Sequence, residues 1–403
     1  MNLVPVVVFA VVYAGMVGGG LPFLQLDRTG IALLGAIALV AFEVVSPEAA
    51  AGSVHLPTMV LLFSFMVVSA HLQVSGFYGW VTRWIAALPL RPPALLAALM
   101  AAAAALSAVF SNDVICLAMA PILADAAARR GLAPVPFLLG LACAANVGSA
   151  ATLIGNPQNM LIGSALKLSF GGYFFEAIGP VLVSLAVAWG IVAWQARGRW
   201  SAPAGAAAAP ADHPRVNPWQ TSKGLALTLV LLVVFLDGRW PREVAALTAA
   251  GLLLLSRRMH SQEKLGLVDW ELLVLFFGLF VVNHAFEATG IPARFVADLA
   301  AAGFDIARPA PLFVTVFGLS NVVSNVPAVM LLLPWARHPE AGPLLALVST
   351  LAGNLLIVGS VANIIVVDAA AARGIRIGWR THARVGVPVT LATLGVTALF
   401  LAM

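Results

Sequence analysis

The sequence predicts an all-α, polytopic membrane protein made of two repeats with opposite membrane topology. Three observations support this fold class: the composition, the recurrence of long apolar segments and an internal repeat. The chain has 403 residues, of which 61% are hydrophobic and 10% are charged, and its mean hydropathy is +0.99. Soluble domains are about 45–50% apolar and about 25% charged, so the composition excludes an ordinary soluble protein.

Apolar stretches long enough to cross a bilayer as helices recur along the whole chain. The short alternating strands that are typical of a membrane β-barrel are not found. A short amphipathic segment is expected after the third span of each half, at 77–88 and at 293–302. We expect simple membrane spans at 3–20, 29–46, 57–75 and 174–195, and again at 223–237, 243–256, 270–288 and 384–402.

The two halves of the sequence resemble each other. Residues 60–76 (VLLFSFMVVSAHLQVSG) align with 274–290 (VLFFGLFVVNHAFEATG). Further along, Ser111-Asn112 aligns with Ser324-Asn325, and Gly155 and Asn159 align with Gly359 and Asn363. Chance matches among Leu, Val and Ala explain apolar identities, but they do not explain polar and glycine matches in the same order. The sequence therefore predicts an internal duplication.

Two segments in each half are too long for a single span. At about 1.5 Å per residue, residues 94–127 would form a helix of roughly 50 Å, although the hydrocarbon core is about 30 Å thick. A polar tip at its centre predicts a re-entrant hairpin, and the next segment is interrupted by a polar break. We predict repeat 1 at 1–197 (hairpin 94–127, broken helix 135–165), a cytoplasmic linker at 198–222, and repeat 2 at 223–403 (hairpin 309–336, broken helix 343–370).

Five crossings and one hairpin per repeat would turn the second repeat upside down relative to the first. The positive-inside rule tests this arrangement. With the N-terminus and the C-terminus outside, all but six of the 22 Lys and Arg residues fall on the cytoplasmic side. The exceptions are Lys167, Arg239, Arg242, Arg294, Arg308 and Arg337. The net charge of +5 is explained by this bias, and we expect no nucleic-acid partner.

The tips and breaks are the candidate functional site. Irregular backbone inside a bilayer persists only where it is buried in protein or lines a cavity. A broken helix presents free N–H groups at one end and free C=O groups at the other, and inverted-repeat transporters use such ends to bind substrates and coupling ions. A simple kink sealed by a neighbouring helix is the alternative. The candidate binding residues are Ser111, Asn112, Asp113, Gly155, Asn156, Gln158, Asn159, Ser324, Asn325, Gly359, Ser360 and Asn363.

Asp113 is the most informative ionisable residue, because a carboxylate within the hydrocarbon region is energetically costly and is functional by default. It is expected to bind a cation or to carry a proton, unless it only caps a hairpin tip in polar surroundings. Its aligned position in repeat 2 is Val326. His284 and Glu287 lie three residues apart on one helix face, but their position favours a solvated helix end over a proton relay.

The motifs FSNDVICLAMAPIL (110–123), NVGSAATLIGNPQNMLIG (146–163), SNVPAVMLLLP (324–334) and GNLLIVGSVANIIVVDAAAARG (353–374) resemble the ion transporter superfamily. That superfamily includes divalent anion–sodium symporters, citrate transporters, arsenical pump membrane proteins and some sodium–proton antiporters. The resemblance covers nearly the whole chain. It implies possible sodium sites at Ser111, Asn112 and Gly155 and at Ser324, Asn325 and Gly359, and it implies a homodimer. The dicarboxylate symporters have Thr where this chain has Asp113 and Val326.

These observations together predict a multi-pass protein of the cell inner (plasma) membrane that is not an enzyme. The leading hypothesis is an ion-coupled secondary transporter of a small anionic or neutral oxyanion by alternating access, elevator-like and coupled to sodium or protons. An arsenite efflux permease or antiporter is the first alternative, and a sodium–proton antiporter or an anion channel is the second. No cofactor is expected beyond the coupling ion. No HExxH or GxSxG motif and no paired catalytic carboxylates occur in the chain.

Overall fold

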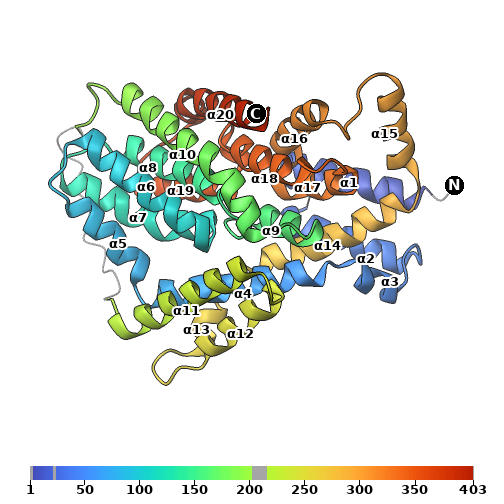
Figure 1. Cartoon of the computed structure of the whole chain (residues 1–403), viewed down its shortest axis with the longest axis horizontal. Coiled ribbons are helices and arrows are strands. Elements are labelled where there is room, and N and C mark those ends of the chain that lie inside the picture. The colour runs from blue at the N-terminus through green and yellow to red at the C-terminus, as the bar shows by residue number, and fades with distance from the viewer. Residues whose placement is uncertain (1–2, 21–23, 202–215, 403) are drawn as a thin grey trace.

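The computed structural model describes residues 3–20, 24–201 and 216–402, and most of these residues are helical. Figure 1 shows the helices packed into one elongated body. The first half contains α1 (Val4–Gly18), α2 (Arg28–Ala41), α3 (Pro47–Ser53), α4 (Leu56–Val74), α5 (Phe77–Ala87), α6 (Pro92–Phe110), α7 (Asn112–Arg129), α8 (Pro134–Ser149), α9 (Pro157–Ala165) and α10 (Phe170–Gln195).

The second half again contains ten α-helices among the described residues, although α17 is much shorter than α7. Its elements are α11 (Pro218–Asp237), α12 (Arg242–Leu254), α13 (Ser261–Leu265), α14 (Trp270–Glu287), α15 (Ile291–Ala301), α16 (Pro309–Val323), α17 (Asn325–Leu332), α18 (Ala341–Ala352), α19 (Val361–Ala371) and α20 (Trp379–Leu401). Short 3-10 turns follow α17 (Leu333–Trp335) and precede α19 (Ile357–Gly359). The membrane orientation of the two halves stays a prediction.

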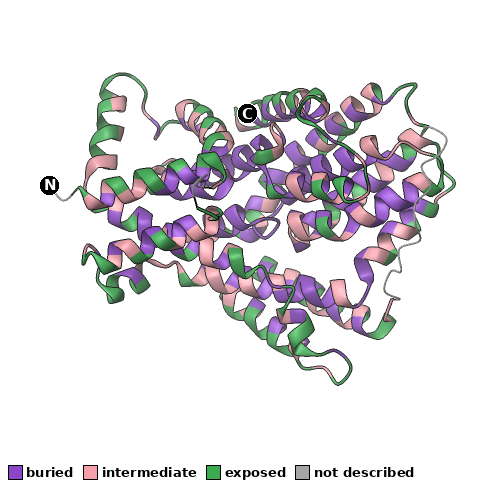
Figure 2. Ribbon diagram, turned by 180° about the vertical axis from the view of Figure 1, so that it is seen from behind, coloured by how far each residue is buried: buried purple, intermediate pink, exposed green. Residues whose placement is uncertain are grey.

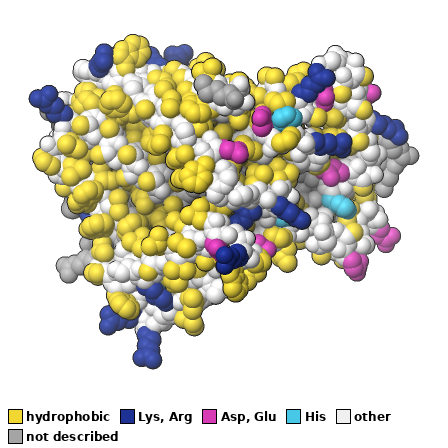
Figure 3. Space-filling view, viewed as in Figure 1, with side chains coloured by type: hydrophobic (Ala, Val, Ile, Leu, Met, Phe, Trp, Pro, Cys, Tyr) yellow, Lys and Arg dark blue, Asp and Glu magenta, His cyan; other side chains and the backbone are white. Residues whose placement is uncertain are grey.

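The predicted all-α, polytopic membrane fold is confirmed. Six helices in the described part of the chain are long and apolar enough to cross a membrane by length and composition, namely α4, α6, α10, α11, α14 and α20. Large hydrophobic side chains are exposed on many of these helices. In Figure 3 such side chains cover most of the left part of the face, while the acidic and histidine side chains visible there lie toward the right. This surface suits a lipid environment.

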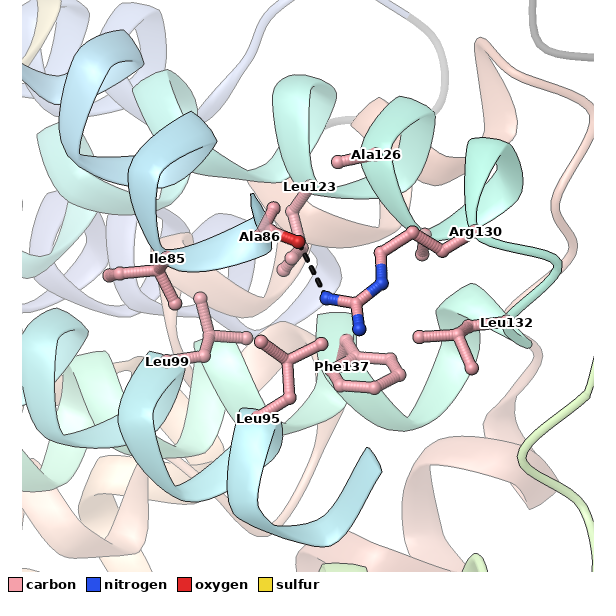
Figure 4. A pocket seen from close by; sticks show the side chains of 10 residues that line it. Ile85, Ala86, Leu95, Leu99, Leu123, Ala126, Arg130, Leu132 and Phe137 are labelled. Atoms are coloured by element: carbon pink, nitrogen blue, oxygen red, sulfur yellow. Dashed lines mark hydrogen bonds between the residues drawn. The ribbon is translucent and has the colours of Figure 1, made fainter. Parts of the chain in front are cut away.

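The first long segment folds as two antiparallel arms that meet at Ser111. The guanidinium of Arg130, directly after α7, donates hydrogen bonds to the carbonyl oxygens of Ala86 (2.6 Å), Leu88 (3.0 Å) and Leu90 (3.3 Å), which precede α6. The end of the second arm therefore lies beside the start of the first. Figure 4 shows this end of the hairpin, where Arg130 reaches Ala86 across a small apolar pocket.

Helix α11 begins earlier than expected, inside the range 198–222 that the sequence predicts to be a linker. Asn217 caps the helix, because its Oδ1 atom accepts a hydrogen bond from the backbone N–H of Gln220 (3.2 Å). Pro218 occupies the first turn, where its missing N–H is not needed. The polar residues Asn217 and Gln220 suggested a loop, but they form a helix start. Residues 202–215 of the predicted linker lie outside the described residues.

The helices pack in two groups. Helix α4 packs against α11, α12 and α13, and α14 packs against α1 and α2; in Figure 1, α4, α11, α12 and α13 lie along one edge. The second group packs around the broken helices, with α6, α7 and α10 against α8, α16 against α18, and α20 against α10 and α18. All residues of α18 and nearly all of α8 are buried, and Figure 2 shows this buried centre.

Candidate functional site

The two predicted hairpin tips have the same backbone geometry. Ser111 is the single residue between α6 and α7 and has a φ of +73°. Ser324 is the single residue between α16 and α17 and has a φ of +76°. A non-glycine residue at positive φ is uncommon, and such residues persist where the surrounding structure enforces them. Each serine therefore marks a sharp reversal of the chain between two helices, at the same position of the sequence alignment in both halves.

Tip 1, the turn around Ser111, lies directly against the break of its own repeat. The backbone N–H of Asn112 donates to the carbonyl oxygen of Gly155 at 3.2 Å. Gly155 has no room for a side chain, because a Cβ atom there would collide with the backbone of Ser149. The structure thus brings together Ser111, Asn112 and Gly155, three residues that the sequence assigned to one site.

The polar residues of the first break hold its irregular backbone in place. Asn156 caps α9 through its Oδ1 atom, which accepts from the N–H of Asn159 at 2.9 Å. The amide of Asn159 donates to the carbonyl oxygen of Thr152 at 3.1 Å. Part of the hydrogen-bonding capacity that the sequence suggested for a ligand is therefore used within the protein. All three residues are at least 95% buried.

Asn146 of α8 connects the two repeats at the centre of the molecule. Its Oδ1 atom accepts hydrogen bonds from Asn112 Nδ2 and from Ser360 Oγ, both at 2.9 Å. Its Nδ2 atom donates to the side-chain oxygens of Asn354 (2.9 Å) and Asn363 (3.1 Å). Three of these four partners belong to the second break, so a residue of repeat 1 organises the site of repeat 2.

Thr350 of α18 makes the reciprocal contacts. Its hydroxyl oxygen accepts from Asn156 Nδ2 (3.1 Å) and Gln158 Nε2 (3.3 Å), and it lies 3.4 Å from the side-chain oxygen of Asn159. All three partners belong to the first break. A residue of repeat 2 therefore contacts the break of repeat 1. The predicted residues Asn112, Asn156, Gln158, Asn159, Ser360 and Asn363 belong to one hydrogen-bonded cluster, whereas no hydrogen bond among the described residues joins Ser324 or Asn325 to it.

Asn146 and Thr350 are not among the binding residues predicted from the sequence. The alignment that places Gly155 on Gly359 also places Asn146 on Thr350, so the signal was available nine residues before the glycine in each break. A single Asn or Thr in an apolar helix did not stand out on its own. Only the packing of the repeats shows that each side chain crosses to the opposite break.

Asp113 lies at the N-terminus of the half-helix that belongs to the other repeat. Its carboxylate lies near the backbone N–H of Ala362, the second residue of α19. The Oδ1 atom is covered by protein and has no hydrogen-bond partner among the described residues. The start of a helix attracts negative charge, so this carboxylate occupies a position that favours an anion. The aligned Val326 is buried and apolar.

Tip 2, the turn around Ser324, presents oxygen atoms that lack partners. The side-chain oxygens of Ser320, Asn321 and Asn325 are buried without a hydrogen bond within the described residues. A Cβ added to Gly353 would lie 3.1 Å from Asn325 Nδ2, and one added to Gly359 would lie 3.4 Å from Asn321 Oδ1. Tip 2 therefore packs closely against the second break, and these three side-chain oxygens stay without a partner among the described residues.

The chemistry of the combined site is that of uncharged hydrogen-bonding groups and one carboxylate. None of the cluster's residues is Lys or Arg. Within the described ranges, no group of three or more His, Cys, Asp or Glu side chains could hold a metal ion. Amide and hydroxyl oxygens with a single carboxylate suit a weakly bound monovalent cation, a proton, or a solute that offers hydroxyl groups.

A buried polar centre formed by two broken helices, within an apolar helical body, defines a membrane transporter. The chain belongs to the citrate transporter family, whose model matches residues 6–352. This confirms the predicted superfamily, the multi-pass membrane location and the prediction that the protein is not an enzyme.

Full-length relatives are also membrane transporters or membrane proteins by name. The silicon efflux transporter LSI3 of Oryza sativa subsp. japonica is 29% identical, covering 97% of this chain and 95% of its own. The inner membrane protein YbiR of Escherichia coli is 29% identical, covering 90% and 93%. The crystal structure of the Alcanivorax borkumensis YdaH transporter has the same fold, with a TM-score of 0.55 at 15% identity over 99% of this chain and 97% of that one.

Proposed function

We propose that this protein is an ion-coupled secondary transporter that moves a small oxyanion, or its neutral acid, by alternating access. The observation that carries this proposal is the reciprocal polar cluster, in which Asn146 and Thr350 each reach into the break of the opposite repeat. Inverted-repeat transporters bind substrate and coupling ions at such a repeat interface. A continuous pore, which a channel requires, is not favoured by a centre this densely hydrogen-bonded.

The absence of Lys and Arg from the cluster bears on the substrate. A divalent anion held only by amides and hydroxyls would have no opposite charge nearby, and Asp113 would repel it. A neutral, hydroxyl-rich acid would instead donate to the free oxygens of tip 2 and accept from the amides. The silicon efflux activity in the name of a relative supports this class, which includes silicic and arsenous acids.

Coupling is assigned to Asp113. Its carboxylate lies at the start of α19 without a cationic partner, so a proton or a sodium ion that binds there would neutralise an otherwise costly buried charge. The unpartnered oxygens of Asn112 and Asp113 in repeat 1, and of Asn321 and Asn325 in repeat 2, are the ligands available to such an ion. Occupancy would then change the charge of the moving part of the protein.

Alternating access would arise from relative movement of the two helix groups. The group around α8 and α18 carries both tips and both breaks, and the group with α4, α11, α12 and α14 packs along its side. An elevator-like displacement of the first group would carry the site between the two membrane faces. A homodimer, in which the second group would form the fixed interface, is proposed with it; native mass spectrometry of the detergent complex would test this stoichiometry.

Uptake by proteoliposomes tests the proposal. Vesicles with an imposed pH or sodium gradient are offered arsenite, germanic acid as a tracer for silicic acid, phosphate, sulfate and dicarboxylates, and empty vesicles serve as the control. We expect gradient-driven accumulation of a neutral oxyacid. Conductance far above carrier turnover would support the channel alternative, and sodium–proton exchange without any solute would support the antiporter alternative.

A further inference from the structure

A pocket of about 310 Å³ lies between α14 and the far ends of α9 and α17. Leu161 and Ala165 of α9 form one wall, Met330 of α17 forms another, and Asn283 and His284 of α14 form the third. The pocket thus separates the helix group that contains α14 from α9, which leads away from the first break, and from α17, which leads away from tip 2.

The inner end of this pocket is close to the polar cluster. Leu161 follows Asn159 by two residues on α9, which corresponds to about 3 Å along a helix. Met330 follows Asn325 by five residues on α17, or about 7.5 Å. A solute in the pocket is therefore little more than one helical turn away from both the first break and tip 2.

Asn283, one of the residues that line the pocket, has a hydrogen-bond donor without a partner among the described residues. The side-chain oxygen of Asn283 accepts from the Tyr13 hydroxyl at 2.9 Å, which fixes the amide. Its Nδ2 atom is buried and has no partner among the described residues, and the whole Asn283 side chain is only 6% exposed. A buried donor without a partner costs about 1–3 kcal/mol, so a ligand oxygen at this position would be stabilised.

The neighbouring ionisable residues favour a neutral ligand. His284 and Glu287 line the same pocket, and none of its lining residues is Lys or Arg. A carboxylate accepts a hydrogen bond from a hydroxyl group but repels a multiply charged anion. His284 also lines a second pocket of about 390 Å³ between α14 and the segment around Ser46, so this side chain lies between two pockets.

In the aligned region of repeat 1, the described residues make direct contacts instead. Ser69 of α4 aligns with Asn283, and its hydroxyl donates to the carbonyl oxygen of Phe110 at tip 1 (2.9 Å). The far ends of α7 and α19 are joined by the ion pair between Asp125 and Arg373, whose atoms approach to 2.8 Å. Access through one end and closure at the aligned end is the asymmetry that alternating access requires.

We propose that this pocket is the outer vestibule of the transport path and that Asn283, His284 and Glu287 bind a neutral oxyacid before it reaches the breaks. The inference rests on the proposed function and adds an entry site to it. We place the pocket on the outer side of the membrane because the distribution of Lys and Arg along the chain predicts that the N-terminus lies outside. Asn283 acts here as a specificity-determining residue, because its free N–H selects a ligand with an oxygen acceptor.

Cysteine labelling tests the vestibule without requiring transport. The native Cys116 and Cys143 are buried and give no background. Ala165→Cys places a thiol on the pocket wall, and Ile162→Cys, on the same helix but fully buried outside the pocket, is the matched control. We expect a membrane-impermeant maleimide to label Ala165→Cys from the outside of right-side-out vesicles, and arsenous or silicic acid to slow this labelling while sulfate and succinate do not.

Labelling of Ala165→Cys only from the cytoplasmic side, or no faster than Ile162→Cys, would overturn the vestibule even if transport is normal. Outside labelling that no neutral oxyacid slows would overturn the proposed ligand. In uptake assays, Asn283→Leu should raise KM about tenfold with little change in kcat, as expected for the loss of one hydrogen bond. An unchanged KM would contradict the role of Asn283.

Discussion

Tip 1 and tip 2 are aligned in sequence and share a positive-φ serine, but they are held very differently. Tip 1 is fastened by hydrogen bonds from Asn112 to Gly155 and Asn146, from Thr152 to the carbonyl of Ala108, and from Ser69 to the carbonyl of Phe110. Among the described residues, no hydrogen bond joins tip 2 to another element. Its free oxygens face the second break instead.

This difference in hydrogen bonding suits the two tips to different roles in the proposed mechanism. The fastened tip 1 positions Asp113 at the start of α19, where the carboxylate can respond to a coupling ion. In the proposed mechanism, the solute binds at tip 2, where the side-chain oxygens of Ser320, Asn321 and Asn325 have no partner among the described residues. The two halves thus present similar tips, and a few side chains give the two tips different hydrogen bonding.

The largest effect should come from the glycines of the two breaks. Gly155→Ala would drive a methyl group into the backbone of Ser149, whereas Gly359→Ala would meet the carbonyl oxygen of Gly353 at 3.1 Å. We expect Gly155→Ala to lose about 3 kcal/mol of unfolding free energy and most transport, and Gly359→Ala to keep both largely intact. Thermal unfolding in detergent and proteoliposome uptake measure the two effects; equal tolerance at both positions would remove the difference between the breaks.

The two residues that cross between the repeats should differ next. Asn146→Leu removes four hydrogen bonds and leaves their buried polar partners unsatisfied. Thr350→Val removes three hydrogen bonds, which are longer in the wild-type protein. Buried hydrogen bonds in membrane proteins contribute about 0.6 kcal/mol each on average. We expect a loss of about 2 kcal/mol for Asn146→Leu and about 1 kcal/mol for Thr350→Val in unfolding by denaturant; the opposite order would mean that the Asn146 contacts do not organise the centre.

The smallest effect concerns the contact that closes repeat 1. Ser69→Ala removes the hydrogen bond to Phe110 and should shift the population of the two access states by about 1 kcal/mol, or roughly fivefold. The labelling rate of Ala165→Cys reports this shift. Thr82→Ala, which removes a buried hydroxyl that bonds only within its own helix, is the control. A similar rate change in both variants would show that Ser69 has no special part in closure.

The sequence predicted the tips and breaks because glycine, proline and amide residues are rare at the centre of apolar segments and recur in the same order in both halves. It placed most helix boundaries within a few residues of those in the structure. It missed the start of α11, because Asn217 and Gln220 have the composition of a loop and act as a helix cap. It also missed Asn146, Thr350 and the free donor of Asn283, because a single polar residue in an apolar helix shows its partners only after the repeats have packed.

In the proposed mechanism, the coupling of transport to an ion gradient depends on Asp113. The most direct test compares wild type, Asp113→Asn and the control Asp368→Asn, an exposed carboxylate on α19, in two proteoliposome assays of one substrate. Equilibrium exchange needs the binding site but no net coupling, and gradient-driven accumulation needs both. We predict that Asp113→Asn retains exchange and loses accumulation under both pH and sodium gradients, while Asp368→Asn retains both. Wild-type accumulation by Asp113→Asn would contradict the account.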